Sequence, residues 1–200
     1  MYPEILSAKQ KEVLPIIEDF GDFGLVGGTA MALQLGHRRS IDFDLFSDKE
    51  FDNAEIRKKI SSRAKIEKIF VDHAGEYTVL INGVKVTFIH YPFGIGFALD
   101  FGKIKIADAL TIAAMKAYAL GRRAKWKDYV DIYFVLKSHG IGEIVERADK
   151  IFGNEFNDKI FRSQLSYFDD IDYSEVVDYL PGHGVDEEVI KNALREKSLE

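Results

Sequence analysis

Strand and helix patterns are segregated along this chain of 200 residues, and that segregation is the strongest constraint on its fold. Runs rich in β-branched and aromatic residues, typical of strands, occupy residues 23–28, 40–47, 65–74, 76–83 and 84–91. Downstream, the apolar spacing is helical over residues 108–120, 124–138, 141–152, 155–168 and 186–197. The sequence therefore predicts an α+β protein with a small mixed β-sheet and flanking helices, followed by a C-terminal helical bundle.

Local signals refine this prediction. Helices are expected between the strands, over residues 7–20, 28–36 and 52–63, with Ser7 as the first N-cap and Gly36 as a stop. Asn82-Gly83 predicts a tight hairpin, and a further short strand is expected near residues 102–107. The pattern changes near residue 105. We therefore predict an α/β core over residues 1–105 and a helical domain over residues 106–200.

The composition is that of a globular protein, with 46% apolar and 30% charged residues. No apolar run approaches the roughly 18 residues of a membrane span, and the N-terminus lacks a signal-peptide pattern. The absence of cysteine excludes disulfides and thiolate metal sites, so we expect a cytoplasmic protein.

The charged residues are unevenly distributed along the chain. Residues 1–140 hold 20 Lys and Arg against 18 Asp and Glu, whereas residues 141–200 hold 7 against 15. We expect any polyanion to bind within the first 140 residues.

Two aspartates, Asp42 and Asp44, stand one residue apart inside the strand pattern of residues 40–47. Alternation along a strand places both carboxylates on one face, with apolar neighbours on the other. Strands disfavour aspartate and like charges repel, so the arrangement requires a positive partner. A divalent cation is one candidate, and neutralisation by Arg38 and Arg39 is the other.

A glycine turn precedes the two aspartates. Gly27, Gly28 and Thr29 end one strand pattern and begin a helix pattern. Glycines at such a turn let a phosphate approach the backbone, where the helix start presents N–H groups and Thr29 adds a hydroxyl. Mg²⁺ usually takes one or two carboxylates plus substrate phosphates. The stretch is therefore typical of a site for a nucleoside triphosphate carried by Mg²⁺ or Mn²⁺.

A second candidate block begins at Lys116, the only charge that interrupts the apolar part of its predicted helix. Such a lysine either extends to solvent or serves a negative ligand. Arg123 follows about two turns later, so both side chains point one way if the helix continues past Gly121. Asp128 and Asp131 are one turn apart in the next helix. A helix-dipole effect or a salt bridge to a nearby lysine is their alternative explanation.

The stretch LVGGTAMALQLGHRRSIDFDLF (25–46) resembles the signature of nucleotidyltransferases of the DNA polymerase β-like superfamily. Within that superfamily it is most similar to the AbiEii/AbiGii-type toxins of abortive-infection and toxin–antitoxin systems. The block IADALTIAAMKAYALGRRAKWKDYVDIYFVL (106–136) is similar to the downstream K…R…KD…D motif of the same family. The resemblance covers roughly residues 20–140.

The resemblance implies transfer of a nucleoside monophosphate from an NTP to a hydroxyl of an RNA, such as a tRNA end, or of a protein. It implies a Mg²⁺ or Mn²⁺ cofactor and a toxin role countered by a separate antitoxin. The metal ligands expected are Asp42 and Asp44. The catalytic residues expected are Asp42, Asp44, Lys116 and Asp128. The nucleotide-binding residues expected are Gly27, Gly28, Thr29, Arg39, Lys116 and Arg123.

One departure from the superfamily concerns a third carboxylate, which many polymerase β-like enzymes carry on a later strand. The matching strand here is predicted over residues 84–91, which contain no Asp or Glu. Three explanations are open. Asp128 takes over the activation of the attacking hydroxyl, two carboxylates suffice for catalysis, or the chain binds nucleotide without turnover. The last case defines the alternative function, a catalytically degenerate nucleotide- or protein-binding module. A structural α/β protein with aspartate–arginine pairs is the third interpretation.

Two further features have open interpretations. None of the five histidines shows metal-ligand spacing, and His37 beside the predicted site is either a phosphate contact or a loop histidine without a chemical role. Trp126 and Tyr129 lie among basic residues, which is typical of a nucleic-acid patch, although helix packing explains these aromatics equally well.

Overall fold

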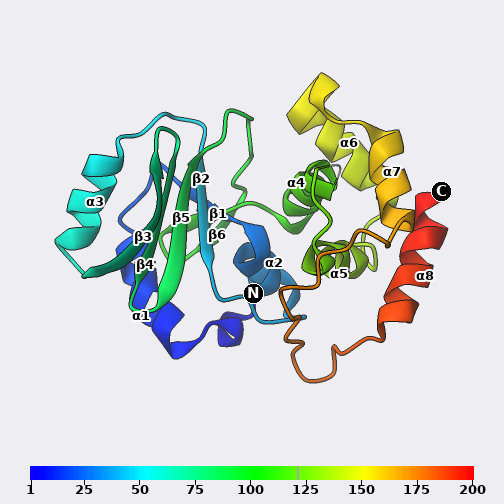
Figure 1. Ribbon diagram of the computed structural model, residues 1–200, viewed down its shortest axis with the longest axis horizontal. Coiled ribbons are helices and arrows are strands. Elements are labelled where there is room, and N and C mark those ends of the chain that lie inside the picture. Colours follow the sequence, from blue (N-terminus) through cyan, green and yellow to red (C-terminus); the bar gives the residue numbers. More distant parts are fainter. Residues whose placement is uncertain (121) are drawn as a thin grey trace. The chain divides into compact units, whose positions relative to one another are not determined.

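The computed structural model describes residues 1–120 and 122–200 (Figure 1). Its contacts divide the chain into two compact units. The sheet unit comprises Met1–Gln34 and Arg39–Asp108. The helical unit comprises Leu35–Arg38 and Ala109–Glu200.

The sheet unit is built on a seven-stranded sheet with the order β3-β4-β5-β2-β1-β7-β6. Its strands are β1 (Gly24–Val26), β2 (Phe43–Ser47), β3 (Ile66–His73), β4 (Glu76–Ile81), β5 (Val84–His90), β6 (Leu99–Phe101) and β7 (Ile104–Ile106). Its helices are η1 (Pro3–Ile5), α1 (Ala8–Ile17), α2 (Gly27–Leu35, whose last residue belongs to the helical unit) and α3 (Asn53–Ser61). The β2–β5 and β1–β7 pairs are parallel and the others antiparallel, so the sheet is mixed.

Local chemistry explains where several of these elements begin and end. Ser7 forms a capping box with Gln10 and starts α1, as the sequence predicts. Gly36 has a φ of +63°, which ends α2. Asn82 and Gly83 have φ angles of +49° and +71°, as a two-residue hairpin between β4 and β5 requires.

Alternating burial along the central strands fixes which face of the sheet forms the core. On β2, Phe43 and Leu45 are buried, while Asp44 and Phe46 are partly exposed. Phe88 of β5 is fully buried and contacts further aromatic rings of the sheet unit. Asp44 therefore lies on the face of β2 opposite the apolar core.

Two strand predictions differ from the structure. The strand expected over residues 40–47 begins at Phe43, so Asp42 lies one residue before it and the side chain of Ile41 is exposed. The strand β6 was not predicted, because three residues in a glycine-rich stretch are too short to show alternation. It forms a hairpin with β7 around Gly102, whose φ is +61°.

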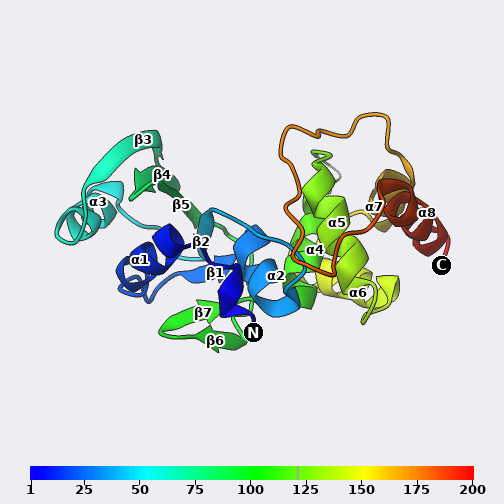
Figure 2. The same ribbon diagram turned by 90° about the horizontal axis from the view of Figure 1, so that it is seen from below.

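The helical unit contains α4 (Ala109–Leu120), α5 (Trp126–Val135), α6 (Ile141–Phe152), η2 (Gly153–Glu155), α7 (Asp158–Ser166) and α8 (Glu187–Ser198). Helix α4 packs against α5 and α6, and α8 packs against α5 and α7 (Figure 2). The predicted fold class, a mixed sheet with flanking helices followed by helices alone, is confirmed. Among the described helices, none combines the length and the apolar character that crossing a bilayer requires.

Candidate active site

Gly27 lies at the turn from β1 into α2 and packs against one of the two aspartates. Its φ is +70°, a conformation that glycine adopts without strain. A β-carbon at this position would overlap the carboxylate oxygen Oδ2 of Asp44. The glycine is therefore required both for the turn and for the close approach of Asp44 to the start of α2.

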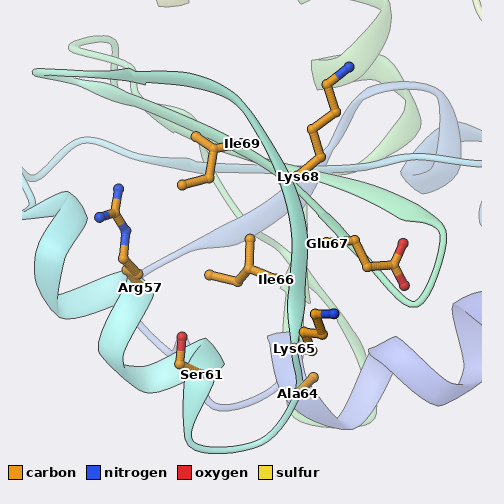
Figure 3. A pocket seen from close by; sticks show the side chains of 8 residues that line it. All are labelled: Arg57, Ser61, Ala64, Lys65, Ile66, Glu67, Lys68 and Ile69. Carbon is orange, nitrogen blue, oxygen red and sulfur yellow. The ribbon is translucent and has the colours of Figure 1, made fainter.

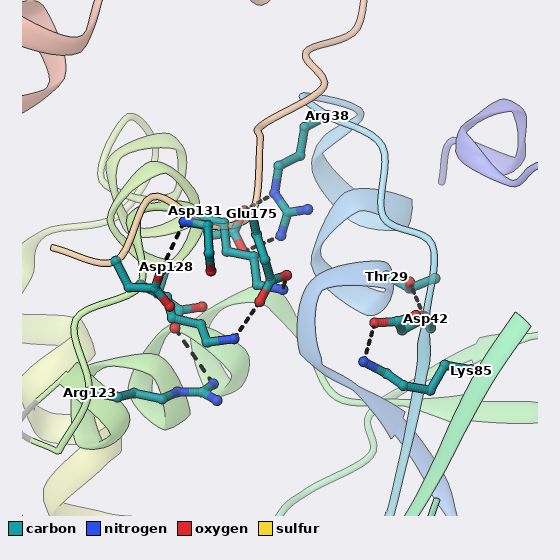
Figure 4. Close-up of polar contacts among 12 residues, drawn as sticks. Thr29, Arg38, Asp42, Lys85, Arg123, Asp128, Asp131 and Glu175 are labelled. Atoms are coloured by element: carbon teal, nitrogen blue, oxygen red, sulfur yellow. Dashed lines mark hydrogen bonds and ion pairs between the residues drawn. The ribbon is translucent and has the colours of Figure 1, made fainter. Parts of the chain in front are cut away.

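Thr29, in the first turn of α2, is buried, and its hydroxyl donates a hydrogen bond to the backbone carbonyl of Asp42. This bond ties the helix start to the residue before β2 (Figure 4). A phosphate contact by the Thr29 hydroxyl would have to replace it. The backbone N–H groups of the first turn, which have no partner within a helix, are the other donors available there.

Asp42 and Asp44 are both partly exposed, and their surroundings differ. Asp44 lies within β2, opposite Val26 of β1 and Thr87 of β5. The Asp42 carboxylate oxygen Oδ2 lies 2.8 Å from the Nζ of Lys85 on β5 (Figure 4). Sequence reasoning missed Lys85, because its proximity depends on the parallel pairing of β2 with β5.

The two arginines considered as partners of these aspartates lie in different units. Arg39 belongs to the sheet unit and is exposed. Arg38 belongs to the helical unit, where its Nε and Nη2 donate to the two carboxylate oxygens of Asp131, each at 2.7 Å. Arg38 thus pairs with Asp131 of its own unit, whereas Arg39 belongs to the unit that holds Asp42 and Asp44.

The donor set of the sheet unit fits a divalent cation. Asp42 and Asp44 supply hard oxygen ligands beside a glycine turn in which a β-carbon would leave no room for the Asp44 carboxylate. In the part of the chain that is described, no three His, Asp or Glu side chains gather into a metal site. Two carboxylates are the number that Mg²⁺ commonly takes from a protein, with phosphates and water as its other ligands.

The helical unit holds a buried group that we call the ionic cluster: His37, Arg38, Lys116, Asp128 and Asp131. Lys116 of α4 pairs with the Oδ1 of Asp128, and its Nζ lies 3.0 Å from the Oδ2 of Asp131. The side chain of Lys116 is only 8% exposed, so it does not extend to solvent. The structure brings Lys116 and Asp128, which the sequence singled out, into contact with Asp131, whose only signal in the sequence is its one-turn spacing from Asp128.

Charge pairing outweighs burial at Lys116 and Asp131, whereas burial prevails at His37. Burial raises the pKa of Asp131, but Arg38 and Lys116 outweigh it and hold that pKa well below its usual range. Burial lowers the pKa of Lys116, and Asp128 and Asp131 raise it above its usual value. Burial lowers the pKa of His37 despite its hydrogen bond to Asp131. We therefore expect charged Lys116 and Asp131 and a neutral His37 at pH 7.

Asp128 has one carboxylate oxygen without a hydrogen bond. Its Oδ1 is held by Lys116, while Oδ2 is buried and accepts no hydrogen bond from any described residue. The Nη2 of Arg123 lies 3.6 Å from that Oδ2, and the Arg123 side chain is 57% exposed. The structure thus brings Lys116, Arg123 and Asp128 together. Helix α4 is described as far as Leu120. Lys116 and Arg123 were expected to point one way if the helix continues past Gly121, and Gly121 lies outside the described residues.

The structure decides between the two interpretations of the aromatic residues that lie among basic residues. Trp126 and Tyr129 are 7% and 0% exposed, so they belong to the core rather than to a nucleic-acid patch. Lys125 and Lys127 both pair with Glu175. The aromatic residues are therefore explained by helix packing.

A groove of about 760 Å³ lies between α3 and β3 in the sheet unit. Ile66 and Ile69 point toward the α3 side, where Arg57 lies, while Lys68 points away (Figure 3). None of the predicted site residues lines this groove. It carries no arrangement of groups for nucleotidyl transfer, and the residues around Asp42 and Asp44 remain the candidate active site.

Known proteins resemble this chain in sequence and in fold. Residues 12–106 match the family described as nucleotidyl transferase AbiEii toxin, type IV toxin–antitoxin system. The uncharacterized protein aq_aa25 of Aquifex aeolicus is 31% identical over 202 residues, covering 96% of this chain and 97% of that protein. JHP933 from Helicobacter pylori has a TM-score of 0.60 at 18% identity, covering 97% of this chain and 92% of that one. MenT4, the nucleotidyltransferase toxin Rv2826c of Mycobacterium tuberculosis H37Rv, has a TM-score of 0.61 at 10% identity, covering 96% and 84%.

Proposed function

Because the chain belongs to the AbiEii nucleotidyltransferase toxin family, we propose that it transfers a nucleoside monophosphate from an NTP to an acceptor hydroxyl. The acceptor oxygen forms a bond to the α-phosphorus while the bond from that phosphorus to the β-phosphate oxygen breaks. Pyrophosphate leaves, and the hydroxyl proton passes to a carboxylate. The observation that carries the proposal is the pair Asp42 and Asp44 packed beside the Gly27 turn.

The sheet unit supplies the groups that hold the triphosphate. A divalent cation held by Asp42 and Asp44 neutralises phosphate charge and activates the attacking oxygen. The backbone N–H groups of Gly27, Gly28 and Thr29 at the start of α2 contact the β- and γ-phosphates. The exposed Arg39 adds positive charge for the same ligand.

The helical unit supplies the groups assigned through the resemblance. Asp128 is our candidate for the proton acceptor, because its Oδ2 accepts no hydrogen bond from the described residues. Arg123 is the more accessible cation for the triphosphate, since its side chain is 57% exposed. Lys116 pairs with two carboxylates, and because an ammonium has three N–H donors it can keep both of them while it contacts the triphosphate.

Labelling with α-³²P nucleotides tests the proposal. Wild-type protein, each NTP and Mg²⁺ or Mn²⁺ are incubated with total RNA or with nuclease-treated lysate, and label is sought in a macromolecule. We expect Asp42→Asn and Asp44→Asn to reduce labelling at least about a hundredfold, because the metal contributes several kcal/mol to catalysis. Asp100→Asn is the matched control, since this exposed aspartate of the same unit pairs with Lys105 across the β6–β7 hairpin. Full labelling by both site variants would refute the assignment.

The labelled macromolecule identifies the acceptor, and expression of the protein in cells tests its biological role. Label in RNA, including tRNA ends, identifies a nucleic-acid acceptor, and label in protein identifies a side-chain hydroxyl. As the toxin of a toxin–antitoxin pair, the wild-type protein arrests growth when expressed without its antitoxin, and Asp42→Asn does not. Sustained growth with active wild-type protein would separate the transferase activity from toxicity.

The alternative function, a nucleotide-binding module without turnover, is favoured by one observation. The strand β5, which pairs in parallel with β2, carries Lys85 and Thr87 beside the aspartates and no carboxylate. Asp42-dependent binding of metal and nucleotide without transfer to RNA or protein would support this alternative. Transfer of label to either acceptor eliminates it.

A further inference from the structure

Lys85 occupies the side of Asp42 from which a third carboxylate would be expected. In the parallel register of β2 and β5, Phe43 pairs with Val86 and Asp44 pairs with Thr87. Lys85 is therefore the residue of β5 next to Asp42, and its Nζ lies 2.8 Å from the Asp42 Oδ2. The two side chains are 42% and 25% exposed, so solvent and ions can reach the pair.

The Lys85 ammonium and a divalent cation require the same carboxylate. Asp42 and Asp44 repel each other, and Lys85 offsets one of these charges in the absence of metal. A divalent cation on both aspartates offsets both charges, but it is repelled by an ammonium that stays within a few ångströms. Metal binding therefore competes with Lys85 for the negative charge of Asp42.

We infer that Lys85 is a built-in competitor of the divalent cation and sets how tightly the site binds it. The inference rests on the proposed function, because it requires that Asp42 and Asp44 are the metal ligands. Lys85 acts through Asp42 and is thus a positioning residue. It makes the affinity for the cation lower than two aspartates alone would give.

Direct titration with Mn²⁺, followed by the electron paramagnetic resonance signal of the unbound ion, tests this inference without any turnover. Lys85→Met keeps the aliphatic stem and removes the charge, and we expect it to bind Mn²⁺ about tenfold more tightly than wild type. Lys85→Arg keeps the charge and should retain the wild-type affinity. Thermal unfolding of each variant confirms that it is folded.

The matched control is Lys105→Met. Lys105 is also a strand lysine of the sheet unit and pairs with an aspartate, its Nζ lying 2.7 Å from the Asp100 Oδ1. Its loss removes the same charge from the same unit without touching Asp42, so Mn²⁺ affinity should stay within about twofold of wild type. Tightening by Lys105→Met equal to that by Lys85→Met would reduce the effect to net charge and overturn the inference.

The aspartate variants separate the two proposals. If Asp42→Asn removes Mn²⁺ binding but Lys85→Met leaves it unchanged or weaker, the metal site stands and the role of Lys85 is overturned. If Mn²⁺ binds equally well to Asp42→Asn and Asp44→Asn, or does not bind to wild type, the proposed metal site fails and the inference fails with it. Tighter binding in Lys85→Met that Asp42→Asn abolishes is the expected result.

Discussion

Gly27 is the position in the sheet unit where a single methyl group should do the most damage to the candidate site. Its φ of +70° strains any other residue, and a β-carbon would overlap the Asp44 carboxylate. We expect Gly27→Ala to lower the free energy of unfolding by about 1–3 kcal/mol and to weaken Mn²⁺ binding, because Asp44 must move. Urea unfolding measures the first effect, and Mn²⁺ titration measures the second.

Gly21→Ala is the control for this prediction. A β-carbon at Gly21 meets no atom within 4 Å. Its unfolding free energy should therefore stay within about 0.5 kcal/mol of wild type, with unchanged Mn²⁺ affinity. Equal stability and equal metal binding in Gly27→Ala and Gly21→Ala would show that the close packing of Gly27 against Asp44 does not matter.

At the scale of elements, residues 167–186 between α7 and α8 contact α5 and the residues before it through polar groups as well as aromatic rings. Glu175 pairs with Lys125 and Lys127, and the Asp172 backbone bonds to Ala124 and Trp126. Burial raises the pKa of Glu175, but hydrogen bonds from the two lysines outweigh it and lower the pKa to about 2. The folded state therefore favours the ionised carboxylate.

That shift gives a pH dependence with a definite sign. A carboxylate with a lowered pKa stabilises the fold above its ordinary pKa of 4.5 and loses this contribution as the pH falls toward 2. We expect the difference in unfolding free energy between wild type and Glu175→Gln to be constant from pH 7 to about pH 5 and to shrink below pH 4.5. Urea unfolding at pH 7, 5, 4 and 3 measures it. A difference that grows in acid would contradict the role of Glu175, and the exposed Glu146→Gln is the control.

The elements that sequence predicts well are those whose signals are local. The hairpin at Asn82-Gly83, the Ser7 cap and the long helices are each specified within a few residues. The pairing of Asp42 with Lys85 is different, because it depends on β2 and β5 becoming neighbours in parallel. No spacing along the chain reveals such a pair, and the same holds for the pairing of Arg38 with Asp131.

At the scale of the whole molecule, the helical unit is not a continuous piece of chain. Its ionic cluster takes His37 and Arg38 from Leu35–Arg38, which lies between α2 and β2 in the sequence. Composition places a change near residue 105, where strands give way to helices. The composition does not reveal that the short upstream segment Leu35–Arg38 contributes side chains to a buried cluster of the helical unit. A cut at residue 105 would separate Arg38 from Asp131.

This arrangement predicts how an isolated fragment of residues 106–200 behaves. Without His37 and Arg38, the buried Asp128 and Asp131 are left with Lys116 as the only other member of the ionic cluster. Loss of one partner from a buried ion pair typically costs about 3–5 kcal/mol, so the fragment should unfold at much lower urea than the same residues in the full chain. Trp126 is the only tryptophan and lies in α5, so its fluorescence reports this unit selectively.

Arg38→Met in the full chain separates the loss of the guanidinium from the effects of cutting the chain. It should lower the urea midpoint of the Trp126 signal, because Asp131 loses two hydrogen bonds at 2.7 Å from a nearly fully buried arginine. Arg39→Met removes the same charge from the adjacent exposed residue and should leave that midpoint nearly unchanged. If residues 106–200 unfold at the same urea concentration as the full chain, and Arg38→Met matches Arg39→Met, the helical unit does not depend on Leu35–Arg38.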